Sequence, residues 1–179
     1  KRGERLSEQE VRRPRSYELT FKFKQPATRT GVAVAARNAA VAGRLAALSF
    51  DLFYGEHLLI TGANGSGKST LLTWIYRGQP PEGAQNSGSI TGERKVGMVP
   101  QQLPRQGDPG FTSPIWENGI GEVGKGVLHP SLWTKPIPEL SAGNQRRAQI
   151  ALALAASPSL LIIDEPTNYL DLQAMQALE

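Results

Sequence analysis

The sequence predicts an α/β fold with a mainly parallel core sheet and an antiparallel β layer. Two short apolar runs indicate the parallel sheet, because residues 57–61 lead into a glycine-rich loop and a helix, and residues 160–163 end in two carboxylates. Two longer extended segments, 32–42 and 45–53, lie on either side of a glycine and indicate the antiparallel layer.

Composition favours one globular domain without a membrane span. The chain has 179 residues, of which 39% are hydrophobic and 20% charged, with 19 glycines and 13 prolines, as is typical of a loop-rich domain. Its longest apolar stretch, 150–163, is interrupted at 157–159 and is too short to insert into a membrane. With no cysteine and no apolar region after Lys1, the sequence favours a cytoplasmic protein without disulfides or thiolate metal sites.

The positive charge is confined to the N-terminal part. The net charge is +4, and residues 1–24 carry eight basic and four acidic side chains, so residues 25–179 are neutral. Residues 1–16 are charged and unpatterned, which predicts a basic linker tail and leaves 17–179 as the folded domain. RNA or an acidic membrane surface would attract such a tail, although a solvated tail fits the same charges.

The first half of the domain has clear periodic patterns. Alternating apolar residues predict a half-buried strand over 18–24, before the two extended segments. After them a short strand over 57–61 enters the glycine-rich loop. Apolar residues on one face then predict a helix over 68–77, ended by Gly78.

The second half is less regular, because prolines and glycines interrupt it. The expected elements are a surface loop over 79–89, a short strand over 95–99, an irregular stretch over 104–138, a helix over 144–156 capped by Ser141, a strand over 160–163 and a last helix capped by Asp171. The strand over 160–163 is wholly apolar, which predicts that both of its faces are covered.

The glycine-rich loop has the pattern of a phosphate-binding loop. It consists of Gly62, Ala63, Asn64, Gly65, Ser66, Gly67, Lys68 and Ser69, with Thr70 next on the helix. Its glycines let backbone amides converge on a phosphate, and the helix adds its positive N-terminal end. We expect Lys68 to bridge the β- and γ-phosphates of a nucleotide and Ser69 to ligate Mg²⁺. A glycine-rich turn with an incidental lysine is the alternative.

Asp164 and Glu165 form an acidic pair at the carboxyl end of the second apolar run. Open parallel sheets bind ligands at this edge, and adjacent side chains on a strand point to opposite sides. Asp164 is therefore expected to order the Mg²⁺ shell, and Glu165 to polarise an attacking water. Alone, such a pair can simply mark where a strand meets solvent.

Three further segments resemble motifs of ATP-binding cassette (ABC) proteins, a family of P-loop NTPases. Residues 140–147, Leu-Ser-Ala-Gly-Asn-Gln-Arg-Arg, are similar to the signature motif, and residues 164–171 resemble the second acidic motif and D-loop. Gln101 resembles the Q-loop glutamine that reaches metal and water, with Gln102 as a second candidate. The resemblance covers about residues 40–175 and implies an ATPase cassette with ATP and Mg²⁺ as cofactors.

The resemblance also implies a partner cassette. In this family the signature motif addresses the γ-phosphate bound to the opposite cassette, so Ser141 and Gly143 would act in trans. Ordinary helix capping is the alternative for both residues. Arg146 and Arg147, later in the same motif, receive no role.

Residues 165–171 look like the soluble F-type branch, whose members carry two cassettes and act on ribosomes. The basic tail would then be the linker that approaches rRNA or tRNA in a protein similar to the antibiotic-resistance type, and phosphate attraction supports this. A nucleotide-binding subunit of a membrane transporter is the second hypothesis. A fragment that binds nucleotide without catalysis is the third.

The sequence departs from the family pattern at several positions. Tyr169 stands where the F-type branch usually has histidine, and Ala142 and Asn144 replace signature residues. No aromatic residue near Val41 is placed to stack on adenine, and the helical subdomain is expected to be reduced. The switch histidine of the family should follow the second acidic motif, but both histidines of this sequence precede Asp164. The domain is therefore expected to be incomplete at its C-terminus.

Overall fold

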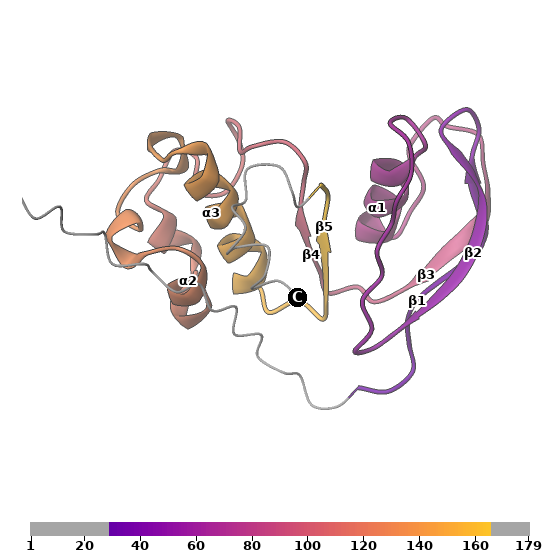
Figure 1. Cartoon of the computed structure of the whole chain (residues 1–179), viewed down its shortest axis with the longest axis horizontal. Coiled ribbons are helices and arrows are strands. Elements are labelled where there is room, and N and C mark those ends of the chain that lie inside the picture. Colours follow the sequence, from indigo (N-terminus) through magenta and orange to yellow (C-terminus); the bar gives the residue numbers. More distant parts are fainter. Residues whose placement is uncertain (1–28, 166–179) are drawn as a thin grey trace, which may run out of the picture.

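The computed structural model describes residues 29–165, except the side chains of residues 122 and 123. In chain order the elements are β1 (Val32–Val41), β2 (Leu45–Phe53), α1 (Lys68–Arg77), β3 (Asn86–Gly92), β4 (Val96–Val99), the 3₁₀ helix η1 (Ile115–Asn118), α2 (Gly121–Val127), the 3₁₀ helices η2 (Pro130–Leu132) and η3 (Ile137–Glu139), α3 (Ala142–Ala155) and β5 (Leu160–Ile163). The basic tail, the strand expected over 18–24 and the helix expected after Asp171 lie outside the described residues. Figure 1 shows the antiparallel strands on one side, α2 and α3 on the other, and β4 and β5 between them.

The antiparallel layer has the strand order β2-β1-β3. Both pairings of β1 are antiparallel, and both lose their regular register near Asn38, whose φ of 45° is left-handed. Gly88 of β3 faces this bulge, and a Cβ there would overlap the Asn38 carbonyl oxygen. Residues 79–89 were expected to be a loop, but β3 already begins at Asn86. The residues of β3 are mostly small and polar and do not alternate between polar and apolar. The strand therefore depends on its pairing with β1.

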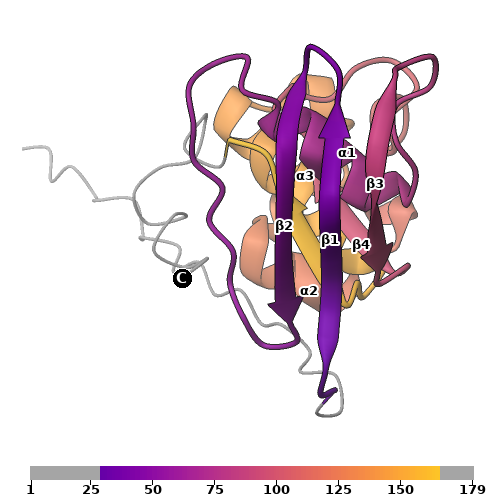
Figure 2. The same ribbon diagram turned by 90° about the vertical axis from the view of Figure 1, so that its right-hand side faces the viewer.

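Helix α1 has the bounds that the sequence predicts. It runs from Lys68 to Arg77, and Gly78, in the left-handed region, donates its N–H to the Trp74 oxygen at 2.8 Å. Leu71, Trp74 and Ile75 are buried, and they pack in one core with residues of the antiparallel layer. Figure 2 shows α1 directly behind that layer.

Strands β4 and β5 pair in parallel, from Val96 opposite Leu160 to Val99 opposite Ile163. Ile162 belongs to the core that β1 and α1 share, whereas Leu161 and Ile163 pack against a second core with α3. Strand β5 is therefore covered on both faces, as its wholly apolar sequence predicts. The parallel pair separates the two cores of the described chain.

The strand expected over 57–61 is not formed in the described structure. These residues have no ladder partner, and Leu58 and Leu59 are 46% and 82% exposed. An extended segment becomes a strand only where a neighbour accepts its backbone hydrogen bonds. Among the described residues, β5 pairs only with β4, so this apolar segment runs as an extended loop into the phosphate-binding loop.

The region between β4 and β5 is a short helical unit around α3. Buried Ile115, Ile120, Leu128 and Ile137 pack with α3 in the second core. An irregular stretch is expected over 104–138, whereas the structure forms the seven-residue helix α2 and short 3₁₀ helices there. The three glycines of α2 disfavour a helix, but Gly124 packs so closely that a Cβ there would lie 2.9 Å from Ile120 Cβ. No helix in the described part of the chain is long and apolar enough to cross a membrane.

Candidate functional site

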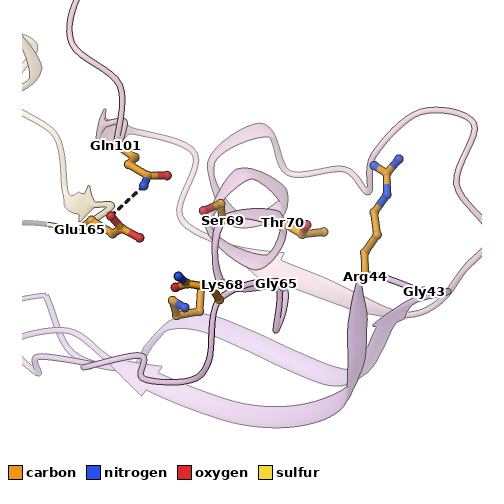
Figure 3. Close-up of a pocket in the computed structure, with 10 residues that line it drawn as sticks. Gly43, Arg44, Gly65, Lys68, Ser69, Thr70, Gln101 and Glu165 are labelled. Carbon is orange, nitrogen blue, oxygen red and sulfur yellow. Dashed lines mark hydrogen bonds between the residues drawn. The ribbon is translucent and has the colours of Figure 1, made fainter.

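A pocket of about 510 Å³ joins the phosphate-binding loop to residues that follow β4 and β5. Its lining consists of Gly43, Arg44, Asn64, Gly65, Gly67, Lys68, Ser69, Thr70, Gln101 and Glu165. Figure 3 shows Gln101 and Glu165 at one end of this pocket, Arg44 and Gly43 at the other, and Lys68 and Ser69 between them. The phosphate-binding loop and the residues 101 and 165, far apart in sequence, therefore form one site.

The loop backbone curls tightly before α1. Gly62, Gly65 and Gly67 all have positive φ angles, of 157°, 81° and 94°. A Cβ on Gly67 would overlap the Arg44 carbonyl oxygen, so the loop lies directly against the turn between β1 and β2. Among the predicted loop residues, Gly62, Ala63 and Ser66 do not line the pocket; they build the curl behind it.

Lys68 is held over the loop that it belongs to. Its Nζ donates to the carbonyl oxygens of Gly62, at 2.8 Å, and Ala63, at 3.0 Å. These bonds keep the ammonium beside the first amides of α1, where the first turn contains no acidic residue. Unpaired amides, the helix dipole and a cation together make an anion-binding site.

Gln101 and Glu165 meet at the carboxyl edge of the parallel pair. Gln101 follows β4 and Glu165 follows β5, and Gln101 Nε2 donates to Glu165 Oε2 at 2.7 Å (Figure 3). Glu165 has a φ of 51°, a left-handed conformation that a residue other than glycine adopts at some cost. Such a conformation is typical of functional sites, where the surrounding structure maintains it.

Asp164, Ser141 and Gly143 do not line the pocket. Asp164 is 5% exposed, and its N–H donates to the Val99 oxygen at 2.9 Å. Ser141 occupies the N-cap position of α3, as predicted, but its side chain makes no capping hydrogen bond. Its backbone oxygen accepts from Gln145 N–H at 2.8 Å. The trans role expected for Ser141 and Gly143 therefore stays a prediction.

The pocket offers oxygen donors that suit Mg²⁺. Ser69 contributes a hydroxyl, Gln101 an amide oxygen and Glu165 a carboxylate, and Asp164 lies one residue before Glu165. No group of three or more histidine, cysteine, aspartate or glutamate side chains in the described part of the chain could hold a metal ion alone. Mg²⁺ commonly binds one or two protein oxygens and completes its shell with phosphates and water, so this donor set fits.

Sequence reasoning missed two parts of the site. The first part is Gly43 and Arg44, which line the pocket from the turn between β1 and β2. Their place in the site follows from the contact of that turn with Gly67, which no sequence pattern indicates. No aromatic side chain is among the described lining residues.

Arg146, to which the sequence analysis gave no role, is fully buried behind the site. It bonds to the backbone where β4 and β5 end. Burial lowers the pKa of its guanidinium, whereas the nearby Asp164 and Glu165 raise it. From the sequence, an arginine in a helix that resembles the signature motif is expected to be exposed. No sequence pattern distinguishes a buried arginine from an exposed one at this position.

The chain matches one family model. This model, described as "ABC transporter", covers residues 45–168. It therefore includes the phosphate-binding loop, the site residues after β4 and β5, and all of α3.

Curated relatives include a ribosome-acting protein and transporter components. The chain is 33% identical over 142 residues to the "Ribosome protection protein VmlR" of Bacillus subtilis, a match that covers 73% of this chain and 25% of that protein. It is 33% identical over 141 residues to the "Zinc import ATP-binding protein ZnuC" of Yersinia pestis, covering 73% and 54%. The matched segments thus span about a quarter to a half of these relatives.

Solved structures with the same fold are also ATP-binding cassettes. One is a dimeric post-hydrolysis state of an ATP-binding cassette bound to ADP and Pi, with a TM-score of 0.61, 24% identity and coverage of 81% of each chain. Another is an inward-facing metal-chelate type ABC transporter, with a TM-score of 0.62, 24% identity and coverage of 83% of this chain and 66% of that one. At these identities the likeness shows the fold.

Proposed function

The chain belongs to the ABC transporter family of ATP-binding cassettes, and we propose that it binds ATP and Mg²⁺ in the pocket as the hydrolytic cassette of an F-type protein that acts on the ribosome in the cytoplasm. The observation that carries the catalytic part is the joining of the phosphate-binding loop with the Gln101–Glu165 pair in one pocket. The phosphate-binding loop in the middle of this pocket is suited to phosphate, and the Gln101–Glu165 pair at one end supplies what hydrolysis of a phosphoanhydride needs (Figure 3).

The orientation of the nucleotide follows from the charges along the pocket. Lys68 and the amides at the start of α1 hold the β- and γ-phosphates. Gln101 and Glu165 stand at one end, so the γ-phosphate points to them. The nucleoside then lies toward Gly43 and Arg44. The Arg44 guanidinium is the only cationic side chain that the described pocket lining has at that end.

The Mg²⁺ ion would be held by Ser69, Gln101 and Asp164 together with phosphate oxygens. When bound, it neutralises the negative charge that the phosphates carry during the reaction. Ser69 and Gln101 line the pocket, and Asp164, which is buried after β5 next to Glu165, would supply a carboxylate to the ion. Replacing Asp164 would therefore weaken nucleotide binding in Mg²⁺ more than in its absence.

Glu165 would be the general base. A carboxylate accepts the proton of the attacking water as the water approaches the γ-phosphorus, and Gln101 orients that carboxylate by its hydrogen bond. Lys68 stabilises the charge that develops on the γ-phosphoryl oxygens. These assignments give Glu165, Lys68 and Gln101 catalytic roles.

A second cassette would complete the site. Ser141 and Gly143 lie at the start of α3 and outside the pocket of their own chain, as expected of residues that bind the γ-phosphate of a partner. The dimeric state of the solved cassette with ADP and Pi supports this arrangement. The partner is a second cassette of the same polypeptide or a second copy.

Two observations support the ribosome as the target. The chain is 33% identical to a ribosome protection protein, and its basic residues are concentrated in residues 1–24, which suits contact with rRNA or tRNA phosphates. The similarity to the zinc import ATP-binding protein supports the second candidate, a nucleotide-binding subunit of a membrane transporter.

Glu165→Gln in the whole protein distinguishes these candidates. Without a base, ATP is bound but not cleaved, so an F-type protein should remain on ribosomes and sediment with them in ATP. Release of the variant at the wild-type rate would contradict the ribosomal role. Co-purification with a membrane permease, without ribosomes, would favour the transporter subunit.

A further inference from the structure

Arg146 is a fully buried arginine that connects three elements behind the pocket. It lies in α3, with none of its surface exposed. One terminal nitrogen, Nη1, donates to the Pro100 carbonyl oxygen after β4. The other, Nη2, donates to the Asp164 oxygen after β5 at 2.7 Å, with Glu165 O at 3.4 Å. The guanidinium therefore bridges the ends of the two parallel strands.

A second side chain of α3 strengthens this connection. Gln149 lies on the same side of the helix, and its Oε1 is 3.3 Å from Arg146 Nη1. Its Nε2 donates to the Gln102 carbonyl oxygen at 2.9 Å. Arg146 and Gln149 thus hold the backbone on both sides of Gln101.

The cost of burying this group argues against a role in packing alone. A buried guanidinium loses its hydration, which is costly unless hydrogen bonds to the protein replace the lost water. In addition, Arg146 Nε is buried and has no hydrogen-bond partner among the described residues. What the guanidinium supplies, and an apolar side chain cannot, is a rigid planar fork that fixes two carbonyl oxygens at a set separation.

We infer that Arg146 is a positioning residue for the Gln101–Glu165 pair and couples that pair to the helix that begins at the signature motif. The inference rests on the proposed ATPase function. Both residues of the pair are attached directly to the backbone groups that Arg146 holds, and their side chains meet at 2.7 Å. Because Arg146 is part of α3, a displacement of Ser141 and Gly143 by a partner cassette is transmitted to the base and to the glutamine that orients it.

Arg146→Met tests the inference, with Arg94→Met as a matched control at an exposed position. Methionine is unbranched but leaves the Pro100 and Asp164 carbonyl oxygens without their donor, so we expect a thermal midpoint below that of wild type, with the chain still folded. We expect the Kd for MgATP to change by no more than about twofold, and kcat to fall by about tenfold or more, because the pair acts on the transition state. Arg94→Met should change neither value. Arg146→Lys should behave like Arg146→Met, because one ammonium cannot bridge both carbonyls.

A double-mutant cycle separates positioning from general destabilisation. In a Gln101→Ala background Arg146→Met should reduce kcat by less than about twofold, since the pair that it positions is already broken. An equal loss of kcat in both backgrounds would overturn the inference.

Hydrogen exchange provides a readout that needs no turnover. In Arg146→Met, the amides of 101–102 and 164–165 should exchange about tenfold faster, and those of α1 should be unchanged. Unchanged exchange at the strand ends, or a uniform increase in all elements, would contradict the positioning role. A wild-type chain that fails to hydrolyse ATP would instead count against the proposed function, and hydrogen exchange would still decide the role of Arg146.

Discussion

At the residue scale, Gly67 joins the phosphate-binding loop to the turn between β1 and β2. Its φ is 94°, and a Cβ would overlap the Arg44 carbonyl oxygen and lie 3.0 Å from Leu45 atoms. Both neighbours of the missing Cβ are backbone or core atoms, which cannot move aside easily. The same contact brings Gly43 and Arg44 to the pocket.

Gly67→Ala should therefore destabilise the chain by more than the backbone strain of about 1–2 kcal/mol that alanine has in the left-handed region. Gly83→Ala is the control, because Gly83 has a φ of 68° with nothing within 4 Å of its Cβ position. It should show the strain alone. Urea unfolding of both variants measures the difference, and equal losses would contradict the close packing of the loop.

Glu93, which follows β3, connects Arg29 before β1 and Tyr54 after β2 through one carboxylate. Its Oε1 accepts from the Lys95 and Arg94 N–H groups, and its Oε2 from Tyr54 OH at 2.8 Å and Arg29 Nη1 at 2.6 Å. The backbone bond from Lys95, then the Tyr54 hydroxyl, lowers the pKa of Glu93 below its ordinary 4.5. A carboxylate with a lowered pKa in the folded state stabilises that state while it is ionised.

Wild type should therefore be more stable than Glu93→Gln at neutral pH, and this advantage should be complete above pH 4.5. As the pH falls below 4.5 through the lower pKa of the folded state, the advantage should disappear. Thermal unfolding of both chains between pH 7 and pH 3 measures this. A difference in stability that does not change with pH would contradict the ionised contacts of Glu93.

Individual site residues could be predicted better than their surroundings. The phosphate-binding loop and the acidic pair are visible as local sequence patterns, and Lys68 and Glu165 line one pocket. Arg146 could not be predicted, because its partners are carbonyl oxygens at the ends of two distant strands. Backbone acceptors leave no pattern in a sequence.

At the element scale, elements with their own periodicity or end signals could be predicted, and those that depend on a neighbour could not. Helix α1 has an apolar face and a glycine stop, and β5 is continuously apolar. Strand β3 lacks any such pattern and forms by pairing with β1. Residues 57–61 differ in the opposite way. Their apolar composition predicts a strand, but no described strand pairs with them, so none forms.

The packing of α1 on the antiparallel layer depends on Trp74, which is 2% exposed. Trp74→Ala should lower the free energy of unfolding by about 3–5 kcal/mol, because it removes a large buried side chain and leaves a cavity. Trp116→Ala is the control, since Trp116 is 55% exposed, and it should cost no more than about 0.5 kcal/mol. Similar losses in the two variants would show that α1 does not pack through Trp74.

At the scale of the whole molecule, the pocket lies where two halves of the chain meet. The antiparallel layer and α1 share one core, and α3 and the short helical unit share the other, with β4 and β5 between them. The first half contributes the phosphate-binding loop, and the strand ends that α3 holds contribute Gln101 and Glu165. This division places the residues that we propose to bind phosphate and to activate water on separate cores joined by the parallel pair.

Calorimetric titration of the chain with ATP in the presence of Mg²⁺ tests the central claim most directly. We predict one bound nucleotide per chain, and a loss of affinity of about tenfold or more in Lys68→Ala, because the alanine removes the cation that faces the phosphates. Lys125→Ala, at an exposed position of α2 outside the pocket, should bind as wild type does. The absence of binding to the wild-type chain, or equal affinity in Lys68→Ala, would contradict the assignment of the pocket.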